Sequence, residues 1–452
     1  MASLEVTNWF GDLVSHPQVI VEAHTKEDII AIMKDPVKYP SPVRAVGSNH
    51  STAPCGVADG GTLVKMGNMN SILSISADSV TAQAGALYFD VAHELEKHNL
   101  QFYVNTEIGS LSFGSAACAG TKDGSMPGEF GQVSSYATNV KMVLPSGELL
   151  EVTEDQPDLM RKVRSSYGLF GIVYEATLRV KPIQPMAVYH ETFTLDDFGR
   201  RLPELWARNE SMMFYTFPFD DLITVEFRKY NPGASGSPER HVWKLRNFMW
   251  GTAGPLFCHE LETTIPNATI RYKTVDTFNA TWRFNLTHLI KSDYTIATDQ
   301  IIHYPPVSNN SRYTFSLWAF PEERYPEVLP VYFKFSKDYY QQKGYRSNML
   351  SVGYRILKDQ ESLLSYSYDG NVMTVDPVST GNPGWKPFLE AYNELCVNLG
   401  GAPLLNQTYG VTRALAQKAL GGRLKEFAAA RKQFDPGNRL LNAYFQDMLA
   451  EQ

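Results

Sequence analysis

The stretch VRAVGSNHST, residues 43–52, decides how the N-terminal part of this chain folds. Its first half is rich in β-branched residues and is bounded by Gly47 and Ser48, which predicts a short strand over 43–48. Small residues then surround His50. Such residues let a backbone approach a ligand closely, and consecutive backbone N–H groups bind anions. The stretch therefore predicts a strand that ends in a ligand-binding loop, with an ordinary tight turn as the alternative.

The whole chain is long and moderately acidic. Its 452 residues exceed what one hydrophobic core holds, so we expect two or three domains. The net charge of −7 argues against nucleic acid as a partner. No apolar run approaches the roughly twenty residues of a spanning helix, and the first residues lack a signal-peptide pattern. We therefore expect no membrane segment and a cytoplasmic location. The four cysteines lack metal-ligand spacing, and no metal site is expected.

Short strands and helices follow one another on both sides of the opening stretch. Hydrophobic periodicity and the turn residues predict an α+β region over residues 1–184. Its expected strands and hairpins are 18–24, 43–48, 61–66, 72–85, 140–153 and 171–182, and its expected helices are 25–36, 89–99 and 157–168. From 185 to 435 aromatic strands alternate with helical stretches, which predicts a second α+β domain on a large sheet. Its clearest candidates are strands at 212–219, 221–230 and 312–320 and a helix at 327–342.

Two more loops share the composition of the first. They are EIGSLSFGSAACAGTKDGS, residues 107–125, and SSYGLFGIV, residues 165–173. Neither contains GxGxxG or GxxxxGK[ST] between a strand and a helix, which disfavours nicotinamide-type and P-loop binding. Serine and threonine hydroxyls suit a diphosphate without requiring lysine. Three such loops in one domain favour a shared ligand over three unrelated turns.

In this order, the loops resemble the FAD-binding domain of the vanillyl-alcohol-oxidase type flavoproteins, closest to the aldonolactone and alditol oxidase branch. VRAVGSNHS is similar to that family's Arg-x-x-Gly-Ser-x-His-Ser loop. GSLSFGSAACAGTKDGS resembles its second diphosphate loop, in which Gly-Thr precedes His or Lys. GIVYEATLRVKP and FDPGNRLLNAYF match the strand at the domain's end and the closing sequence beside the flavin.

The resemblance implies an α+β, two-domain fold of the PCMH type. A FAD-binding domain of two α+β subdomains would span 1–184, and a substrate (cap) domain on a large antiparallel sheet would span 185–435. A C-terminal segment, 436–452, would return to the flavin. The chain would then be an FAD-dependent oxidoreductase that acts on a small-molecule CH–OH donor by hydride transfer to flavin N5, with O2 as the expected acceptor.

The same resemblance assigns cofactor contacts. In many relatives the histidine of the first loop is bonded to the flavin, which implies a covalent link through His50, with a non-covalent loop histidine as the alternative. A neutral imidazole is a nucleophile at physiological pH. Ser110 stands where some relatives carry a second linking cysteine, so single attachment is expected, and Cys118 is expected to pack near the cofactor. The implied FAD-binding residues are Arg44, Gly47, Ser48, Asn49, His50, Ser51, Gly109, Ser110, Ser112, Gly114, Ser115, Gly120, Thr121, Gly171, Val173 and Asn442.

On the substrate side the family pattern fails. Relatives have Glu-x-Arg on a strand that faces the flavin, and SNMLSVGYRILKDQ matches its arginine at Arg355 with Gly353 at the glutamate position. The alternative for Arg355 is a strand arginine paired with Asp359 or Asp369. The motif Arg-Pro-His-Trp-x-Lys resembles APLLNQ, residues 402–407, with Leu404 and Gln407 in place of His and Lys. Arg355, Tyr354 and Gln407 are the catalytic candidates, and Tyr409 is a further site candidate.

These replacements leave the substrate open. A sugar-lactone or alditol oxidase is the family default. The lost polar residues favour a tailoring oxidase of a less polar metabolite. A flavin-fold protein without redox turnover is the alternative from a different class. The identity of the base, the choice between oxidase and dehydrogenase, and the oligomeric state do not follow from the sequence.

Overall fold

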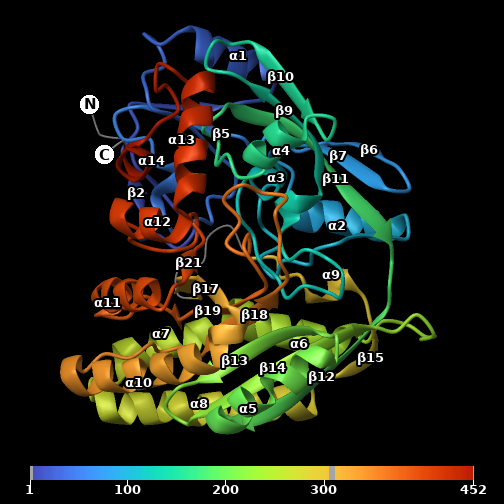
Figure 1. Ribbon diagram of the computed structural model, residues 1–452, viewed down its shortest axis with the longest axis vertical. Helices are drawn as coiled ribbons and strands as arrows, with labels where there is room; N and C mark the ends of the chain where they lie inside the picture. The colour runs from blue at the N-terminus through green and yellow to red at the C-terminus, as the bar shows by residue number, and fades with distance from the viewer. Residues whose placement is uncertain (1–3, 305–310, 451–452) are drawn as a thin grey trace.

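The computed structural model describes residues 4–304 and 311–450, and two layered halves lie one above the other (Figure 1). The upper half holds the loops described above. A three-stranded parallel sheet there has the order β3-β5-β4, and the opening stretch supplies β4. Beside it lies an antiparallel sheet in the order β10-β9-β11-β7-β6, with β8 pairing the far end of β11. The predicted hairpins at 72–85 and 140–153 are confirmed as β6–β7 and β9–β10.

The elements of this half are short. Its strands are β1 (Val6–Thr7), β2 (Val14–Ser15), β3 (Val19–Glu22), β4 (Val43–Val46), β5 (Thr62–Lys65), β6 (Ile72–Ile75), β7 (Ser79–Gln83), β8 (Leu100–Phe102), β9 (Ala137–Val143), β10 (Leu149–Thr153) and β11 (Ile172–Pro182). Its helices are α1 (Lys26–Lys34), α2 (Tyr88–Lys97), α3 (Phe113–Cys118) and α4 (Pro157–Val163). The expected cap of α1 is present, because Thr25 and Asp28 form a capping box.

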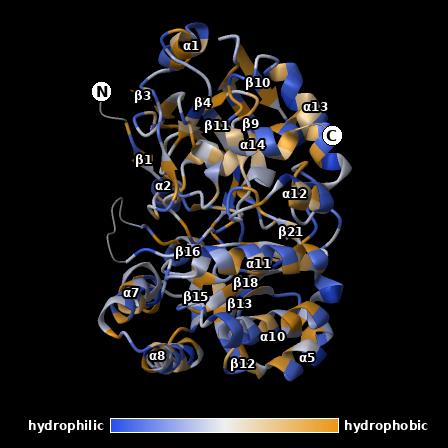
Figure 2. Ribbon diagram, turned by 90° about the vertical axis from the view of Figure 1, so that its left-hand side faces the viewer, coloured by the Kyte–Doolittle hydropathy of each residue, from blue (hydrophilic) through white to orange (hydrophobic). Residues whose placement is uncertain are grey.

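The lower half is built on one eight-stranded antiparallel sheet, as the resemblance implies. The strand order is β15-β12-β14-β13-β18-β19-β17-β21. The upper half covers one face of this sheet, and helices α5, α8 and α10 lie on the other side (Figure 1). Figure 2 shows these outer helices in mixed hydrophobic and hydrophilic colours, as expected for helices with one buried face. Every residue of β13 is buried, so the sheet is covered on both faces.

The strands of the lower half are β12 (Met186–Thr194), β13 (Ser211–Phe217), β14 (Leu222–Tyr230), β15 (Ser292–Thr295), β17 (Trp318–Pro321), β18 (Ser351–Ile356), β19 (Val372–Val375) and β21 (Ala402–Pro403). A separate pair joins β16 (Thr314–Phe315) to β20 (Val378–Ser379). The helices are α5 (Leu195–Ala207), α6 (Arg240–Phe248), α7 (Gly254–Thr264), α8 (Ala268–His288), α9 (Ala297–Gln300), α10 (Tyr325–Lys343) and α11 (Trp385–Asn398). A π-helical turn, Met249–Ala253, joins α6 to α7.

Two parts of this half differ from the sequence prediction. The single strand expected at 312–320 is wrong, because the backbone breaks into β16 and β17, which pair in different sheets. At the break, the N–H of Leu317 donates to the carbonyl of Gln407 instead of to a neighbouring strand. The helical layer α6–α8 is not predicted by the sequence pattern. Threonines have low helix propensity, yet along α8 those at 274, 277, 281 and 287 donate to the carbonyl four residues earlier.

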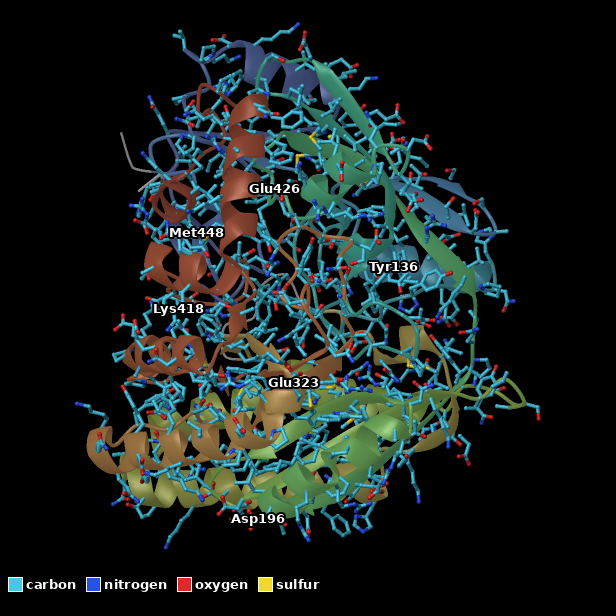
Figure 3. The ribbon with its side chains drawn as sticks, in the orientation of Figure 1. Tyr136, Asp196, Glu323, Lys418, Glu426 and Met448 are labelled. Atoms are coloured by element: carbon cyan, nitrogen blue, oxygen red, sulfur yellow. The ribbon has the colours of Figure 1, made fainter. Side chains whose placement is uncertain are left out.

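The C-terminal helices α12 (Arg413–Leu420), α13 (Gly422–Phe434) and α14 (Ala443–Leu449) return to the upper half. Phe427 and Phe434 of α13 stack on Phe170, with ring centroids 5.4 and 5.0 Å away. Glu426, labelled in Figure 3, pairs with Arg161 and Lys162 of α4. The division of the chain at 184 and 435 stays a prediction, and these contacts favour grouping α13 with the first half. Among the described helices, none combines the length and apolarity needed to cross a membrane.

Candidate active site

The three small-residue loops line one cavity of about 1070 Å³ that opens to solvent. It runs from the end of β4 past α3 to the start of β11, so loops far apart in sequence meet where the two halves face each other. Thirteen predicted cofactor residues line it: Arg44, Gly47, Ser48, Asn49, His50, Ser51, Ser112, Gly114, Ser115, Gly120, Thr121, Gly171 and Val173. Cys118, buried and with its thiol pKa raised to about 12 by burial, also lines the cavity. We call this cavity the cradle.

The first loop turns sharply at Asn49. Its φ of 56° is left-handed, a conformation that asparagine tolerates better than most side chains. The Asn49 carbonyl accepts from the N–H of Trp9, and its side chain donates to the carbonyl of Thr7, so the N-terminal segment fixes the turn. To the residues that the structure describes, the backbone N–H groups of 48–51 donate no hydrogen bond. A turn with several free N–H groups is a binding site for an anion such as a diphosphate.

His50 is held by ring packing rather than by hydrogen bonds to described residues. Its imidazole stacks on the Trp9 indole, with centroids 4.9 Å apart and an interplanar angle of 22°. The ring of Tyr304 lies 6.1 Å away. Burial lowers the His50 pKa to about 4, so the imidazole is neutral at neutral pH and keeps a free nitrogen lone pair. A neutral, oriented imidazole at the cradle is the form that can act as a nucleophile.

Arg44 organises the cradle from behind. Its guanidinium donates to the carbonyls of Cys55, Tyr167, Gly168 and Leu440 at 2.9, 2.6, 3.2 and 2.9 Å. These carbonyls belong to the first loop's continuation, the third loop and the C-terminal segment. Burial lowers the Arg44 pKa to about 10, which still leaves the side chain charged at neutral pH. The guanidinium therefore joins three segments of the cradle wall, and its expected direct contact with FAD stays a prediction.

The glycines let the loops approach one another. A Cβ on Gly47 would lie 2.1 Å from Oγ of Ser112, and one on Gly120 would lie 2.0 Å from Cδ1 of Leu404. Any side chain at these positions would push the first and second loops apart or displace the wall of the lower half. The glycines in the sequence therefore mark positions where the loops pack closely, and this close packing gives the cradle its shape.

Three predicted cofactor residues do not line the cradle, and their contact with FAD stays a prediction. The N–H of Gly109 donates to the carbonyl of Ile302. Oγ of Ser110 accepts from the N–H of Tyr304 at 2.9 Å, so both residues anchor the segment before residue 305. Asn442 caps α14 and donates from its amide to the carbonyls of Pro54 and Val57 at 2.8 and 2.9 Å. Its side chain fastens the C-terminal segment to the first loop.

A second cavity, of about 600 Å³, adjoins the cradle. Leu111, Thr121 and Gln407 line both, so a molecule in the second cavity lies against one in the cradle. Its walls are rich in aromatic rings, with a few polar groups. The residues that line it, besides the three shared ones, are Thr106, Glu107, Ile108, Lys122, Trp250, Ile302, Tyr304, Tyr313, Phe315, Val352, Tyr354 and Val378. We call it the substrate cavity.

Two charge pairs stand at the substrate cavity. Arg246, fully buried on α6, pairs with Glu107, and the phenol of Tyr354 donates to Oε2 of Glu107 at 2.9 Å. Burial and the Glu107 carboxylate raise the pKa of Tyr354 far above its usual range, so its phenol is neutral. Lys122 pairs with the buried carboxylate of Asp376. These groups give the apolar cavity fixed donors and acceptors.

Gln407 lies at the junction of the two cavities. Its side chain is 8% exposed, and its Oε1 has no hydrogen-bond partner among the described residues. The same holds for Oδ1 of Asn406, whose amide nitrogen donates to the carbonyl of Gly120. Buried amide oxygens without partners cost free energy, so these two are suited to the imide N–H or hydroxyl groups of bound molecules. The free loop N–H groups and these oxygens together fit an FAD.

Arg355 corrects the substrate-side prediction. Along β18, Val352 and Tyr354 line the substrate cavity, while Arg355 lines neither cavity and pairs with Glu322 at 2.8 Å. Gly353 also faces away, because a Cβ there would meet the ring of Phe214. Side chains alternate between the faces of a strand, so Val352 and Tyr354 share the cavity face, and Gly353 and Arg355 share the opposite face. Arg355 thus matches the paired-arginine alternative, with Glu322 in place of Asp359 or Asp369.

Some residues of the substrate cavity were not predicted from the sequence, and one site candidate lines neither cavity. Tyr409 lines neither cavity, and its carbonyl accepts from the amide of Asn393. Lys122 was visible in the motif, as the residue after Gly120-Thr121, but no role followed from its position. Glu107, Trp250, Tyr304 and Tyr313 come from four separate segments, and no local pattern in the sequence joins them.

Comparison with known proteins agrees with this geometry. The model of the family described as "FAD binding domain" matches residues 17–153, and that of "D-arabinono-1,4-lactone oxidase" matches residues 176–448. L-gulono-1,4-lactone dehydrogenase of Mycobacterium tuberculosis is 21% identical over 446 residues, which cover 98% of each chain. L-gulonolactone oxidase of Bos taurus is 22% identical over 453 residues, 97% of each chain. D-arabinono-1,4-lactone oxidase of Kluyveromyces lactis is 25% identical over 263 residues, 56% of this chain and 48% of that protein.

Among solved structures, cholesterol oxidase from Brevibacterium sterolicum superposes with a TM-score of 0.75 at 15% identity, covering 99% of this chain and 97% of that one. That likeness confirms the predicted fold. The family matches confirm the predicted FAD-binding domain and the flavoenzyme class, since the second of them spans more than half of the chain. The chain belongs to the D-arabinono-1,4-lactone oxidase family of FAD-dependent oxidoreductases.

Proposed function

We propose that this protein oxidises a carbinol carbon of a small sugar lactone, with FAD bound in the cradle and covalently attached through His50. The observation that carries this proposal is the contact between the two cavities, which share Leu111, Thr121 and Gln407. A substrate in the second cavity would meet the cofactor at this junction. The flavin, when bound, supplies two-electron oxidation by taking a hydride from the carbinol carbon, and O2 is the proposed final acceptor.

The chain's own residues would bind the substrate and exclude water. Trp250, Tyr304, Tyr313 and Phe315 form walls on which the C–H faces of a sugar ring can pack. Glu107 is fixed by Arg246 and Tyr354, so its carboxylate cannot rotate freely. Oε1 of Gln407 is a free acceptor for a substrate hydroxyl. The cavity thus combines ring surfaces with a few oriented polar groups, as ligand sites for small molecules do.

A less polar substrate is the second candidate, and the aromatic walls are the observation that favours it. A ring-bearing secondary alcohol would bury more of that surface than a lactone would. The free Oε1 of Gln407 supports the lactone instead, because an apolar ligand would leave this buried oxygen without a partner.

Anaerobic mixing with a substrate panel tests the proposal. L-gulono-1,4-lactone, D-arabinono-1,4-lactone, an alditol and a set of aryl and alkyl secondary alcohols would each be mixed with the purified yellow protein. Bleaching of the flavin absorbance by a lactone supports the proposal, and bleaching by the apolar alcohols alone supports the second candidate. If no compound bleaches the flavin, redox turnover of CH–OH donors is ruled out for these classes, and a flavin-fold protein without turnover remains. Reoxidation with O2, compared with an artificial electron acceptor, separates an oxidase from a dehydrogenase.

A further inference from the structure

We propose that Lys122 and Asp376 together accept the hydroxyl proton of the substrate, with Lys122 as the catalytic residue and Asp376 as a positioning residue that acts through it. This inference rests on the proposed function. It gives the chain a proton acceptor in place of the Glu-x-Arg pair, because Gly353 and Arg355, which match that motif, face away from the cavity. The sequence motif around Gly120-Thr121 places Lys122 beside the cradle without indicating this role.

Of the two charged side chains, Lys122 is the one that reaches the substrate cavity. Lys122 follows Thr121, which lines both cavities, and Lys122 itself lines the substrate cavity. Its ammonium group contacts the Asp376 carboxylate and lies over the rings of Phe315 and Tyr354, 4.5 and 5.2 Å from their centroids. The Lys122 side chain is 9% exposed and that of Asp376 is fully buried. Any molecule in the substrate cavity therefore meets Lys122 first and Asp376 only through it.

The pair is poorly suited to a purely structural role. Removing two charges from water costs free energy that their attraction often fails to repay, so buried ion pairs are weak stabilisers. The second oxygen of Asp376, Oδ1, is buried without a hydrogen-bond partner among the described residues, and the nearby Thr374 hydroxyl lowers the carboxyl pKa. Perturbed, incompletely paired charges in a cavity are typical of catalytic sites.

The other polar groups of the cavity are already engaged. The phenol of Tyr354 donates to Glu107, and Glu107 is paired with Arg246, whose guanidinium stays charged. The phenols of Tyr304 and Tyr313 bond to each other at 2.6 Å. Burial raises the pKa of both tyrosines above the usual range, so neither provides a phenolate. Lys122, backed by Asp376, is the remaining charged side chain that lines the described cavity.

The proton transfer balances as follows. The ammonium of Lys122 gives one proton to the Asp376 carboxylate, and the neutral amine accepts the proton of the substrate hydroxyl as its O–H bond breaks. The carbinol C–H bond breaks with its electron pair leaving as hydride to the oxidised flavin, and a C=O bond forms. At the end Lys122 is again an ammonium group and Asp376 is protonated. The carboxyl proton returns to solvent before the next cycle.

The surroundings of Asp376 set the pH at which this can occur. Burial raises the Asp376 pKa to about 6, and the nearby Lys122 ammonium limits the rise. Besides Lys122, the charge of Asp376 acts on the phenols of Tyr325, Tyr332, Tyr354, Tyr366 and Tyr392, whose pKa values are raised, so they are neutral. Above pH 6 the carboxylate is ionised and can accept a proton. Below pH 6 it is already protonated, so the rate of flavin reduction is expected to fall about tenfold per pH unit.

The test uses three variants of the pair in the flavin-loaded protein. Lys122→Met removes the amine, Lys122→Arg keeps the charge and the ion pair but does not release a proton, and Asp376→Asn removes the acceptor. Lys181→Met is the matched control, because Lys181 is also a buried lysine that pairs with a carboxylate, Glu129, and lies over aromatic rings, yet it lines neither cavity. For each protein, flavin reduction by the best panel substrate is measured from pH 5 to 9. The dissociation constant of that substrate's oxidised product is measured from the shift of the flavin spectrum.

We expect both Lys122 variants to reduce flavin at least 100-fold more slowly at pH 7.5, while product binding to Lys122→Arg changes by less than about threefold. In Asp376→Asn the step near pH 6 should vanish. Lys181→Met should keep the wild-type pH profile. Rescue of the rate by Lys122→Arg would show a structural role and overturn the inference, as would a wild-type profile in Asp376→Asn. If the panel reduces the wild-type flavin but Lys122→Met is unaffected, only this inference fails. If nothing reduces the wild-type flavin, the proposed function fails and this inference fails with it.

Discussion

The phenol of Tyr354 donates a 2.9 Å hydrogen bond to Oε2 of Glu107 and so links the central strand β18 of the lower half to the second small-residue loop of the upper half. Arg246 of α6 pairs with the same carboxylate. Three segments therefore meet at one carboxylate in the wall of the substrate cavity. Because this wall joins the two halves, its loss should affect both stability and substrate binding.

Tyr354→Phe is expected to lower the free energy of unfolding by about 1.5–3 kcal/mol, since it removes a hydrogen bond to a charged group. It should also raise the substrate dissociation constant severalfold, because Glu107 loses one of its two fixed partners. Urea denaturation and anaerobic titration measure the two effects. Tyr325→Phe is the matched control: its phenol donates to the neutral carbonyl of Thr374 in the same sheet, outside the cavities. Equal effects of the two variants on substrate binding would contradict this prediction.

The neutral state of His50 leads to a prediction about covalent attachment. Burial lowers its pKa to about 4, so its nucleophilic form dominates throughout the physiological range. Acid-precipitated wild-type protein should stay yellow and fluoresce on a denaturing gel. His50→Ala should release the colour into the supernatant, whereas His16→Ala, at an exposed histidine beside Asp59, should behave as wild type. A colourless wild-type pellet would exclude the link.

The cradle could be predicted from the sequence because the residues that shape it stand together in short stretches of the chain. Gly47, Gly120 and Gly171 stand at positions where any Cβ would meet another segment, and such positions leave a readable spacing in the chain. The turn at Asn49 is also local, since one residue supplies the left-handed backbone. Loop sequence and loop shape therefore correspond closely in this part of the protein.

The substrate cavity could not be predicted in the same way. Lys122, Trp250, Tyr313 and Tyr354 come from distant segments, and only the folded sheet brings them together. On a strand, moreover, a shift of one residue exchanges the two faces. The arginine of the motif was matched to Arg355, while the cavity face of β18 carries Val352 and Tyr354. Sequence spacing alone did not decide between these registers.

Because Arg355 lies away from both cavities, we expect its substitution to affect stability rather than catalysis. Its guanidinium pairs with Glu322 at 2.8 Å on the face of the sheet away from the cavities. Arg355→Met should lower the free energy of unfolding by about 1–3 kcal/mol, because the largely buried Glu322 carboxylate loses its charged partner and keeps only the amide of Asn371. Flavin reduction should stay within twofold of wild type in stopped-flow measurements. A tenfold or greater slowing would return Arg355 to the reacting centre and would refute the register described above.

Arg44 provides the sharpest test of how the cradle is assembled. Its guanidinium satisfies carbonyls from three segments, and a lysine has neither the planar fork nor the number of donors to replace it. Arg44→Lys should therefore leave buried carbonyls without partners, at about 1–3 kcal/mol for each one lost. We expect a lower thermal midpoint and a reduced ratio of flavin to protein, both read from purified material. Arg423→Lys is the control, since Arg423 also donates to two backbone carbonyls, those of Leu363 and Ser365, but lies outside the cradle. Both substitutions remove hydrogen bonds to backbone carbonyls. If only Arg44→Lys loses flavin, Arg44 is needed to assemble the cradle. Equal flavin content in the two variants would contradict this prediction.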